Sequence, residues 1–282
     1  MDTAIAIPAL NVRALLKKYA LTLRKGLGQN FLIDEIILQE ITQAAEINAE
    51  NHVLEIGAGL GGLTRWLAAS AKRVAAVEMD VRLIPLLQEV MKPYDNVHII
   101  SGDILQLVPA SLMGADNYIV AANIPYYITS ALFRHLLEAE VKPQRMVLTV
   151  QREVAERICA QPGELSLLAL SVQVYGAPKP ILKIPAAAFY PIPKVDSMTL
   201  RVDLYTQPLI PLENLDAFFK LIKAGFSQKR KMLHNALSSG LAWPHEKVEA
   251  LLKNSDVDPH RRAQTLSIDE WRSLTSNYLQ EK

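Results

Sequence analysis

Three apolar runs of this chain each lead to a side chain that can accept hydrogen bonds. The runs are residues 74–77, 97–100 and 118–122, and the side chains that follow them are Glu78, Asp103 and Asn123. Because the carboxyl ends of parallel strands meet at one edge of a sheet, where open α/β proteins bind their ligands, we expect these side chains to lie together. An acid at the end of the second strand can bind ribose hydroxyls. The pattern therefore predicts a site for a nucleotide-like cofactor.

A glycine-rich turn precedes these runs and belongs to the same site. The apolar run 53–56 is followed by four glycines within six residues and then by a helical pattern over 63–69. Glycine adopts positive φ and lets the backbone approach a ligand closely. The spacing of Gly57, Gly59 and Gly62 also satisfies the dinucleotide fingerprint, so the turn alone does not separate NAD from S-adenosylmethionine.

The segment Asn123-Ile124-Pro125-Tyr126 favours a methyltransferase over a dehydrogenase. The amine of a planar base is a poor nucleophile because its lone pair is delocalised into the ring. Two acceptors, the Asn123 side-chain oxygen and the Pro125 carbonyl, can bind its hydrogens and direct the lone pair at a methyl group. Tyr126 can stack on the base, and Phe189 can cover its other face. We therefore predict methyl transfer to a base amine, with Asn123, Pro125, Tyr126 and Phe189 as catalytic residues.

The donor that fits this edge is S-adenosylmethionine. The glycine turn leaves room for its amino-acid portion, Glu78 would bind the ribose hydroxyls, and Asp103 would accept a hydrogen bond from the adenine amine. Asn30 and the backbone of Leu32 could close the site from an N-terminal loop. The predicted cofactor-binding residues are Asn30, Leu32, Gly57, Glu78, Asp103 and Asn123. No metal is expected, since the six histidines show no ligand-like spacing.

The order of the elements predicts an α/β fold. Strands and helices alternate from Val53 to about Tyr205, which is typical of right-handed β-α-β units and a largely parallel sheet. The segment 166–175 fits either a helix or a strand. The proline-stiffened segment 188–197 is expected to stay outside any sheet.

Beyond a short proline linker the pattern is helical, with helices expected over 215–224, 229–238, 245–253 and 268–279. We therefore expect a Rossmann-like class I methyltransferase domain at residues 1–207 and a small all-helical domain at 208–282.

Charge and composition indicate which partners and which cellular location to expect. The net charge is only +1, but two stretches carry basic residues and no acid. They are Arg13, Lys17, Lys18, Arg24 and Lys25 in the first, and Lys220, Lys223, Lys229, Arg230 and Lys231 in the second. Such clusters can contact phosphates even in a near-neutral protein. Cys159 is the single cysteine, and the sequence contains no signal peptide and no apolar run long enough for a membrane span, so we expect a cytoplasmic protein without membrane partners.

Four motifs, in order along the chain, resemble those of the rRNA adenine dimethyltransferase family. They are KGLGQNFL at 25–32, LEIGAG at 54–59, NIPY at 123–126 and FYPIPKVDS at 189–197. The likeness extends to the C-terminal helices, including 226–233 and 265–267. The resemblance implies a Rossmann-like methyltransferase domain, with a helical domain that binds rRNA. Tyr127 stands where many relatives of this family carry a smaller polar residue.

The same resemblance implies a specific substrate. Four methyl groups would be placed on two adjacent adenosines in the 3′-terminal hairpin loop of 16S rRNA. The expected partner is the immature small ribosomal subunit, with a second role as an assembly checkpoint and the enzyme acting as a monomer. The alternatives are a 23S rRNA adenine dimethyltransferase of the erythromycin-resistance type, a non-catalytic nucleic-acid-binding factor on the same fold, and a dinucleotide-dependent dehydrogenase.

Overall fold

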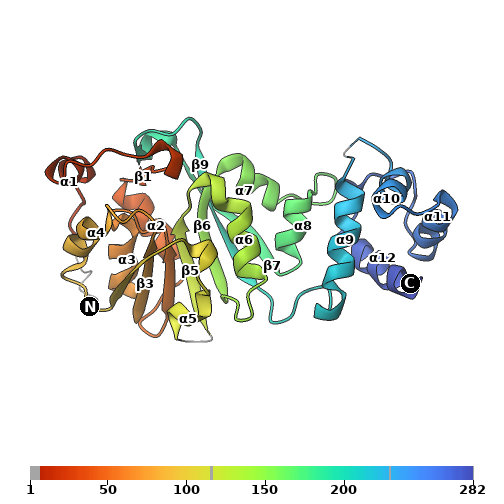
Figure 1. Ribbon diagram of the computed structural model, residues 1–282, viewed down its shortest axis with the longest axis horizontal. Coiled ribbons are helices and arrows are strands. Elements are labelled where there is room, and N and C mark those ends of the chain that lie inside the picture. Colours follow the sequence, from red (N-terminus) through yellow and green to blue (C-terminus); the bar gives the residue numbers. More distant parts are fainter. Residues whose placement is uncertain (1–6, 115–116, 229, 282) are drawn as a thin grey trace. The chain divides into compact units, whose positions relative to one another are not determined.

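The chain folds into two compact units. The computed structural model describes residues 7–114, 117–228 and 230–281 (Figure 1). The first unit comprises Met1–Ala155 and Lys179–Leu204, and the second comprises Glu156–Pro178 and Tyr205–Lys282. The second unit therefore resumes three residues before the boundary expected at 207/208, and it also includes the segment Glu156–Pro178. That segment carries α8 (Leu167–Gln173), in which Leu170 and Val172 are buried. α8 contacts α9 (Leu215–Phe226), which explains why the segment belongs to the second unit.

Within the described residues, seven strands form one sheet in the order β4-β3-β2-β5-β6-β9-β7 (Figure 1). Their bounds are β2 His52–Ile56, β3 Arg73–Glu78, β4 Val97–Ser101, β5 Tyr118–Asn123, β6 Arg145–Gln151, β7 Gly176–Ile184 and β9 Ser197–Leu204. The strands from β4 to β6 pair in parallel, and β9 pairs antiparallel with β6. The strand order changes direction between β2 and β5, which is where open α/β sheets bind ligands. The predicted α/β fold is confirmed.

Helices precede and separate these strands along the chain. From the N-terminus they are α1 Val12–Lys18, α2 Glu35–Ala44, α3 Gly62–Ser70, α4 Ile84–Met91, α5 Pro109–Met113, α6 Thr129–Leu137 and α7 Arg152–Ile158. Apolar residues of α2, α3 and α4 join one core with alternate residues of the central strands. Neighbours such as Val53 and Leu54 are both 0% exposed, so both faces of the sheet are covered. That burial explains why the strands are nearly continuous apolar runs.

Three strands, β1 (Phe31–Leu32), β7 and β8 (Phe189–Tyr190), were not anticipated by the sequence pattern. β1 pairs antiparallel with β8, so the prediction that the proline-rich segment stays outside any sheet is wrong for its first residues. Pro191 follows Phe189 and Tyr190 in the sequence. Both residues of β8 therefore have a backbone N–H group that can pair with β1. β7 contains two prolines but lies at the edge of its sheet, where a missing N–H group is tolerated.

The described residues after β9 form helices and connecting loops, as the sequence pattern predicts. The helices of the second unit after α8 and α9 are α10 Leu233–Leu241, α11 His245–Asn254 and α12 Ile268–Gln280. α9 and α10 pack closely, since a Cβ on Gly240 would stand 2.6 Å from the Cα of Ala224. α10 begins four residues later than predicted because Met232 is extended. Lys229, the expected first residue of that helix, lies outside the described residues. Among the described residues, no helix combines the length and apolar character that crossing a bilayer requires.

Candidate active site

A cavity of about 180 Å³ lies where β2, β3, β4 and β5 end. Its lining contains most of the side chains predicted from the sequence, namely Asn30, Gly57, Glu78, Asp103, Asn123, Pro125 and Tyr126. They come from the loop before β1, from the turn after β2 and from the ends of the next three strands. Residues spread over nearly a hundred positions of the sequence therefore meet at one edge of the sheet.

The glycine turn and Glu78 form the floor of this cavity. Gly57 and Gly59 have φ of 75° and 57°, in the left-handed region where a side chain is strained. The Gly59 N–H donates to Glu78 Oε2 over 2.7 Å, and the Asp80 N–H donates to Oε1 over 2.7 Å. Burial raises the pKa of Glu78 although these backbone donors oppose the shift. The carboxyl is therefore held in one orientation, with acceptor capacity left on each oxygen.

In Asp103 and in Asn123, one polar atom of the side chain is hydrogen-bonded within the protein and orients the other. Asp103 Oδ1 accepts the Leu105 N–H over 3.0 Å and so caps η2 (Ile104–Gln106). Asn123 donates through Nδ2 to the Asn30 carbonyl over 3.1 Å. This donation orients Oδ1 of Asn123 as the acceptor atom of its amide.

The rest of the acceptor motif surrounds Asn123. The Pro125 carbonyl accepts the Ile128 N–H over 3.2 Å, and a carbonyl can accept a second hydrogen bond. The Tyr126 hydroxyl lies 2.7 Å from the hydroxyl of Ser197, which is 0% exposed. Burial raises the pKa of Tyr126, so its phenol stays neutral. The ring is thereby held at the cavity wall from β9.

Leu32 and Phe189 are the two predicted residues that the structure does not bring to this cavity. They face each other across the β1–β8 pair and are 5% and 1% exposed. The pairing turns Phe189 into the apolar core, so the structure contradicts its expected position over a base. Phe31 lines the cavity beside Tyr126 and Tyr127, and its ring lies 2.9 Å from where a Cβ on Gly59 would stand. Leu32 lines a second cavity of about 30 Å³ behind the glycine turn.

Glu55 is a buried acid that was not among the predicted site residues. It is the last but one residue of β2, is 2% exposed, and its Oε2 has no hydrogen-bond partner within the described residues. Burial raises its pKa to about 8. It lines the smaller cavity behind Gly57, together with Leu32. The sequence signal was the acid at the end of an otherwise apolar run.

A polar connection ties the N-terminal loop to the turn after β3. Gln29 donates to Asp80 Oδ2 over 2.8 Å, and Arg82 forms an ion pair with Asp80 at 2.5 Å. Arg82 also donates to the Thr22 carbonyl over 3.1 Å. The Arg82 hydrogen bonds lower the pKa of Asp80 to about 2, although burial opposes the shift. This connection holds the loop that carries Asn30 against the segment that carries Glu78.

The fold and this edge together define a class I S-adenosylmethionine-dependent methyltransferase. The sequence profile described as ribosomal RNA adenine dimethylase matches residues 20–281, and the chain belongs to that family. It is 44% identical to the ribosomal RNA small subunit methyltransferase A of Dehalococcoides mccartyi, with 98% of this chain and 96% of the relative covered.

Two solved structures share the architecture. A dimethyladenosine transferase from Plasmodium falciparum is 28% identical with a TM-score of 0.77, covering 88% of this chain and 97% of that one. The 23S rRNA methyltransferase ErmE is 27% identical with a TM-score of 0.72, covering 88% of this chain and 99% of that one. Both similarities span most of the two units, so the likeness extends beyond the sheet.

Proposed function

We propose that this chain transfers methyl groups from S-adenosylmethionine to the N6 amines of two adjacent adenosines in the 3′-terminal hairpin loop of 16S rRNA, giving N6,N6-dimethyladenosines. The observation that carries the proposal is that Gly57, Glu78, Asp103 and Asn123 all line one cavity. Family membership and the name of the D. mccartyi relative support rRNA adenine as the acceptor.

The donor side is assigned to the acids and the glycine turn. Glu78, whose carboxyl is already oriented by two backbone N–H groups, would accept hydrogen bonds from the ribose hydroxyls. Asp103 has one oxygen occupied by the cap of η2 and would use the other for the adenine amine. Gly57 and Asn30 would line the remainder. When bound, S-adenosylmethionine supplies the electrophilic methyl group.

The acceptor side is assigned to Asn123 and Pro125. Their oxygens would accept the two hydrogens of the adenine amine and aim its lone pair at the donor. No strong general base is needed, because the amine becomes acidic once it is methylated and positively charged, and its proton can pass to water. Tyr126, fixed through Ser197, would stack on the base, which must leave its own stack to enter the site. Phe189 would act from the core by supporting the β1–β8 pair.

The exposed basic residues are the proposed rRNA contacts. In the first unit Arg13 and Lys17 are exposed on α1, whereas Lys18 is paired with Glu89 at 2.6 Å. In the second unit Arg230 and Lys231 are exposed before α10. Their charges would neutralise phosphates. We propose that the natural substrate is the immature small subunit in the cytoplasm, and that the protein acts on it as a monomer.

The test is methyl transfer from labelled S-adenosylmethionine to under-methylated small subunits, large subunits and naked rRNA, with the modified nucleoside identified by mass. We expect dimethyladenosine with small subunits only. Label in large-subunit rRNA would move the protein to the branch that ErmE exemplifies. RNA binding without any label would contradict an enzymatic role altogether.

A further inference from the structure

Tyr126, the last residue of the acceptor motif, and Tyr127, which follows it, contact different neighbours at the cavity. Both lie in η3 (Tyr126–Ile128), whose tight turn sends neighbouring side chains in different directions. Tyr126 reaches Ser197 on β9, as described above. Tyr127 instead packs beside the N-terminal loop, with its Cδ1 3.6 Å from where a Cβ on Gly28 would stand.

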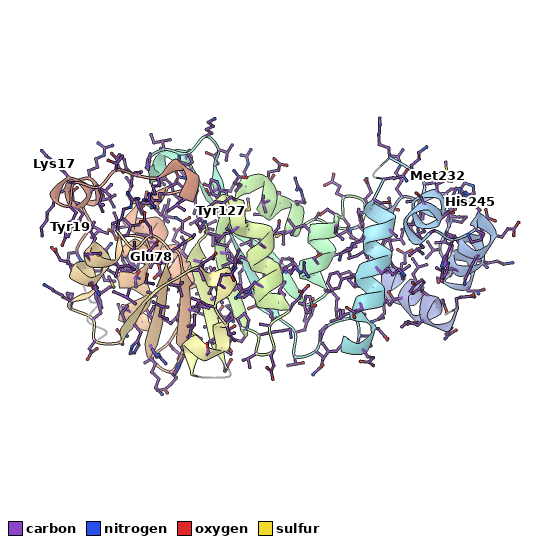
Figure 2. The ribbon with its side chains drawn as sticks, in the orientation of Figure 1. Lys17, Tyr19, Glu78, Tyr127, Met232 and His245 are labelled. Atoms are coloured by element: carbon purple, nitrogen blue, oxygen red, sulfur yellow. The ribbon has the colours of Figure 1, made fainter. Side chains whose placement is uncertain are left out.

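The surroundings of Tyr127 belong to the donor side. Its side chain lines the main cavity, yet 58% of the residue is exposed, so much of it remains accessible to a ligand. Partial burial, followed by the negative charges of Asp103 and Glu78, raises the pKa of Tyr127. Tyr127, Glu78 and Asp103 all line this cavity, and the phenol stays protonated. Figure 2 shows Tyr127 and Glu78 among the side chains of the first unit.

We infer that Tyr127 is a binding residue for the methyl donor, with its ring forming one wall against the adenosine half of S-adenosylmethionine. This inference rests on the proposed function, since it uses the donor site assigned there. The adenosine half is favoured over the methionine half because Tyr127 shares the cavity lining with Asp103 and Glu78, the two acids that would bind adenine and ribose. A target base of rRNA is less suited to this wall, because the loop at Gly28 flanks it.

The energetic reason is the flat aromatic surface. Stacking of a base on an aromatic side chain typically strengthens binding about 5- to 100-fold relative to alanine. A small polar residue at this position would offer neither the area nor the π-face. Tyr127 would therefore increase the affinity of this chain for the donor and for its product while leaving the acceptor pocket to Tyr126.

The experiment is calorimetric binding of S-adenosylhomocysteine and of 5′-methylthioadenosine to the full chain without RNA. Tyr127→Ala should weaken both ligands by about 5- to 100-fold, because both carry the adenosine half. Tyr127→Phe keeps the ring and should bind within about twofold of wild type. Tyr205→Ala is the matched control, since Tyr205 is 40% exposed but outside the cavity lining.

Two outcomes would overturn the inference, and each differs from failure of the proposed function. If Tyr127→Ala binds both ligands as tightly as wild type but raises the KM for small subunits, Tyr127 serves the rRNA. If Tyr127→Phe loses as much affinity as Tyr127→Ala, the hydroxyl acts and the ring face does not. A wild-type chain that binds neither ligand would instead remove the donor site itself.

Discussion

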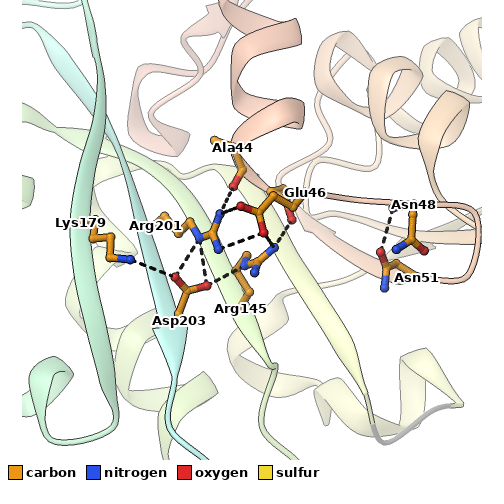
Figure 3. Close-up of polar contacts among 9 residues, drawn as sticks. Ala44, Glu46, Asn48, Asn51, Arg145, Lys179, Arg201 and Asp203 are labelled. Atoms are coloured by element: carbon orange, nitrogen blue, oxygen red, sulfur yellow. Dashed lines mark hydrogen bonds and ion pairs between the residues drawn. The ribbon is translucent and has the colours of Figure 1, made fainter.

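The charged residues at the two ends of the strands of the central sheet have opposite roles. We call these ends the carboxyl edge, where the parallel strands finish, and the second edge, where they begin. At the carboxyl edge, Glu78 and Asp103 accept hydrogen bonds from backbone N–H groups and line an open cavity. At the other edge, Arg145 begins β6 and lies opposite Asp203 on β9. There the carboxylates are bound by guanidinium groups of the protein itself (Figure 3).

At that second edge, the carboxylates and guanidinium groups use most of their hydrogen-bonding atoms on one another. Asp203 accepts from Arg145 Nε at 2.7 Å and from Arg201 Nε at 2.9 Å, while Arg201 Nη1 reaches Glu46 at 2.5 Å. Arg201 also donates to the Ala44 carbonyl over 3.1 Å, at the last residue of α2. Cationic side chains at the C-terminus of a helix donate hydrogen bonds to its free carbonyls and interact favourably with the negative end of its dipole.

This contrast distinguishes charged residues that stabilise the fold from charged residues that remain able to bind a ligand. Acids with two arginine partners have little capacity left for a substrate. Acids held by one or two backbone donors are oriented but keep free lone pairs. We therefore expect substitutions at the carboxyl edge to reduce function with little loss of stability, and substitutions at the other edge to do the reverse.

The largest expected effect is that of Asn123→Ala. Removing the acceptor that aims the adenine amine should lower the single-turnover rate of methyl transfer about 100- to 1,000-fold, as loss of one preorganised polar group does in other sites. Affinity for small subunits should stay close to wild type. The matched control is Asn96→Ala, whose side chain donates to the Ala68 and Ala71 carbonyls away from the cavity. Near-normal turnover of Asn123→Ala would contradict the assigned role.

A smaller effect is expected from Asp103→Asn. Asparagine can keep the cap on Leu105 but replaces the second oxygen with an amide that cannot accept from adenine. Affinity for S-adenosylhomocysteine should fall about 10- to 100-fold, the usual range for a hydrogen bond to a charged group. Asp34→Asn makes the same change at the cap of α2 and should leave this affinity unchanged. Equal losses in both variants would mean that the effect arises from helix capping.

Much of the carboxyl edge could be predicted from the sequence because its geometry follows from topology. Once β2 to β5 are parallel, Glu78, Asp103 and Asn123 must converge, whatever the side-chain details. The glycine turn is local and was equally accessible. The sequence pattern failed for Phe189, since its burial depends on pairing with Leu32, which lies 157 positions earlier.

The second edge could not be predicted in the same way. Arg145, Arg201 and Glu46 are ordinary surface residue types, and no local spacing links them. Their association depends on the antiparallel register of β6 and β9 and on where α2 ends. The connection from Gln29 to Asp80 was missed for the same reason, although an acid two residues after Glu78 was visible.

The smallest effect tests the second edge through stability. Arg201 is 14% exposed in its side chain, so Arg201→Ala should lower the free energy of unfolding by about 1–2 kcal/mol, between the values typical of exposed and buried ion pairs. Donor affinity should not change. Arg134→Ala is the matched control, because its pair with Glu138 is exposed and should contribute less than about 0.5 kcal/mol.

The pH dependence of that loss identifies its origin. Burial would raise the pKa of Asp203, but hydrogen bonds from Arg145 and Arg201 outweigh it and lower the pKa; the Arg201 hydrogen bond likewise lowers the pKa of Glu46. A carboxyl whose pKa is lower in the folded state stabilises the fold above its unfolded pKa, here 3.8 and 4.5, and this stability is lost as the pH falls through the folded value. The difference between wild type and Arg201→Ala in urea titrations should therefore be constant from pH 7 to 5 and shrink below pH 4. A difference that persists unchanged at pH 3 would mean that Arg201 stabilises the edge through its bond to the Ala44 carbonyl and its packing, with no contribution from the carboxylates.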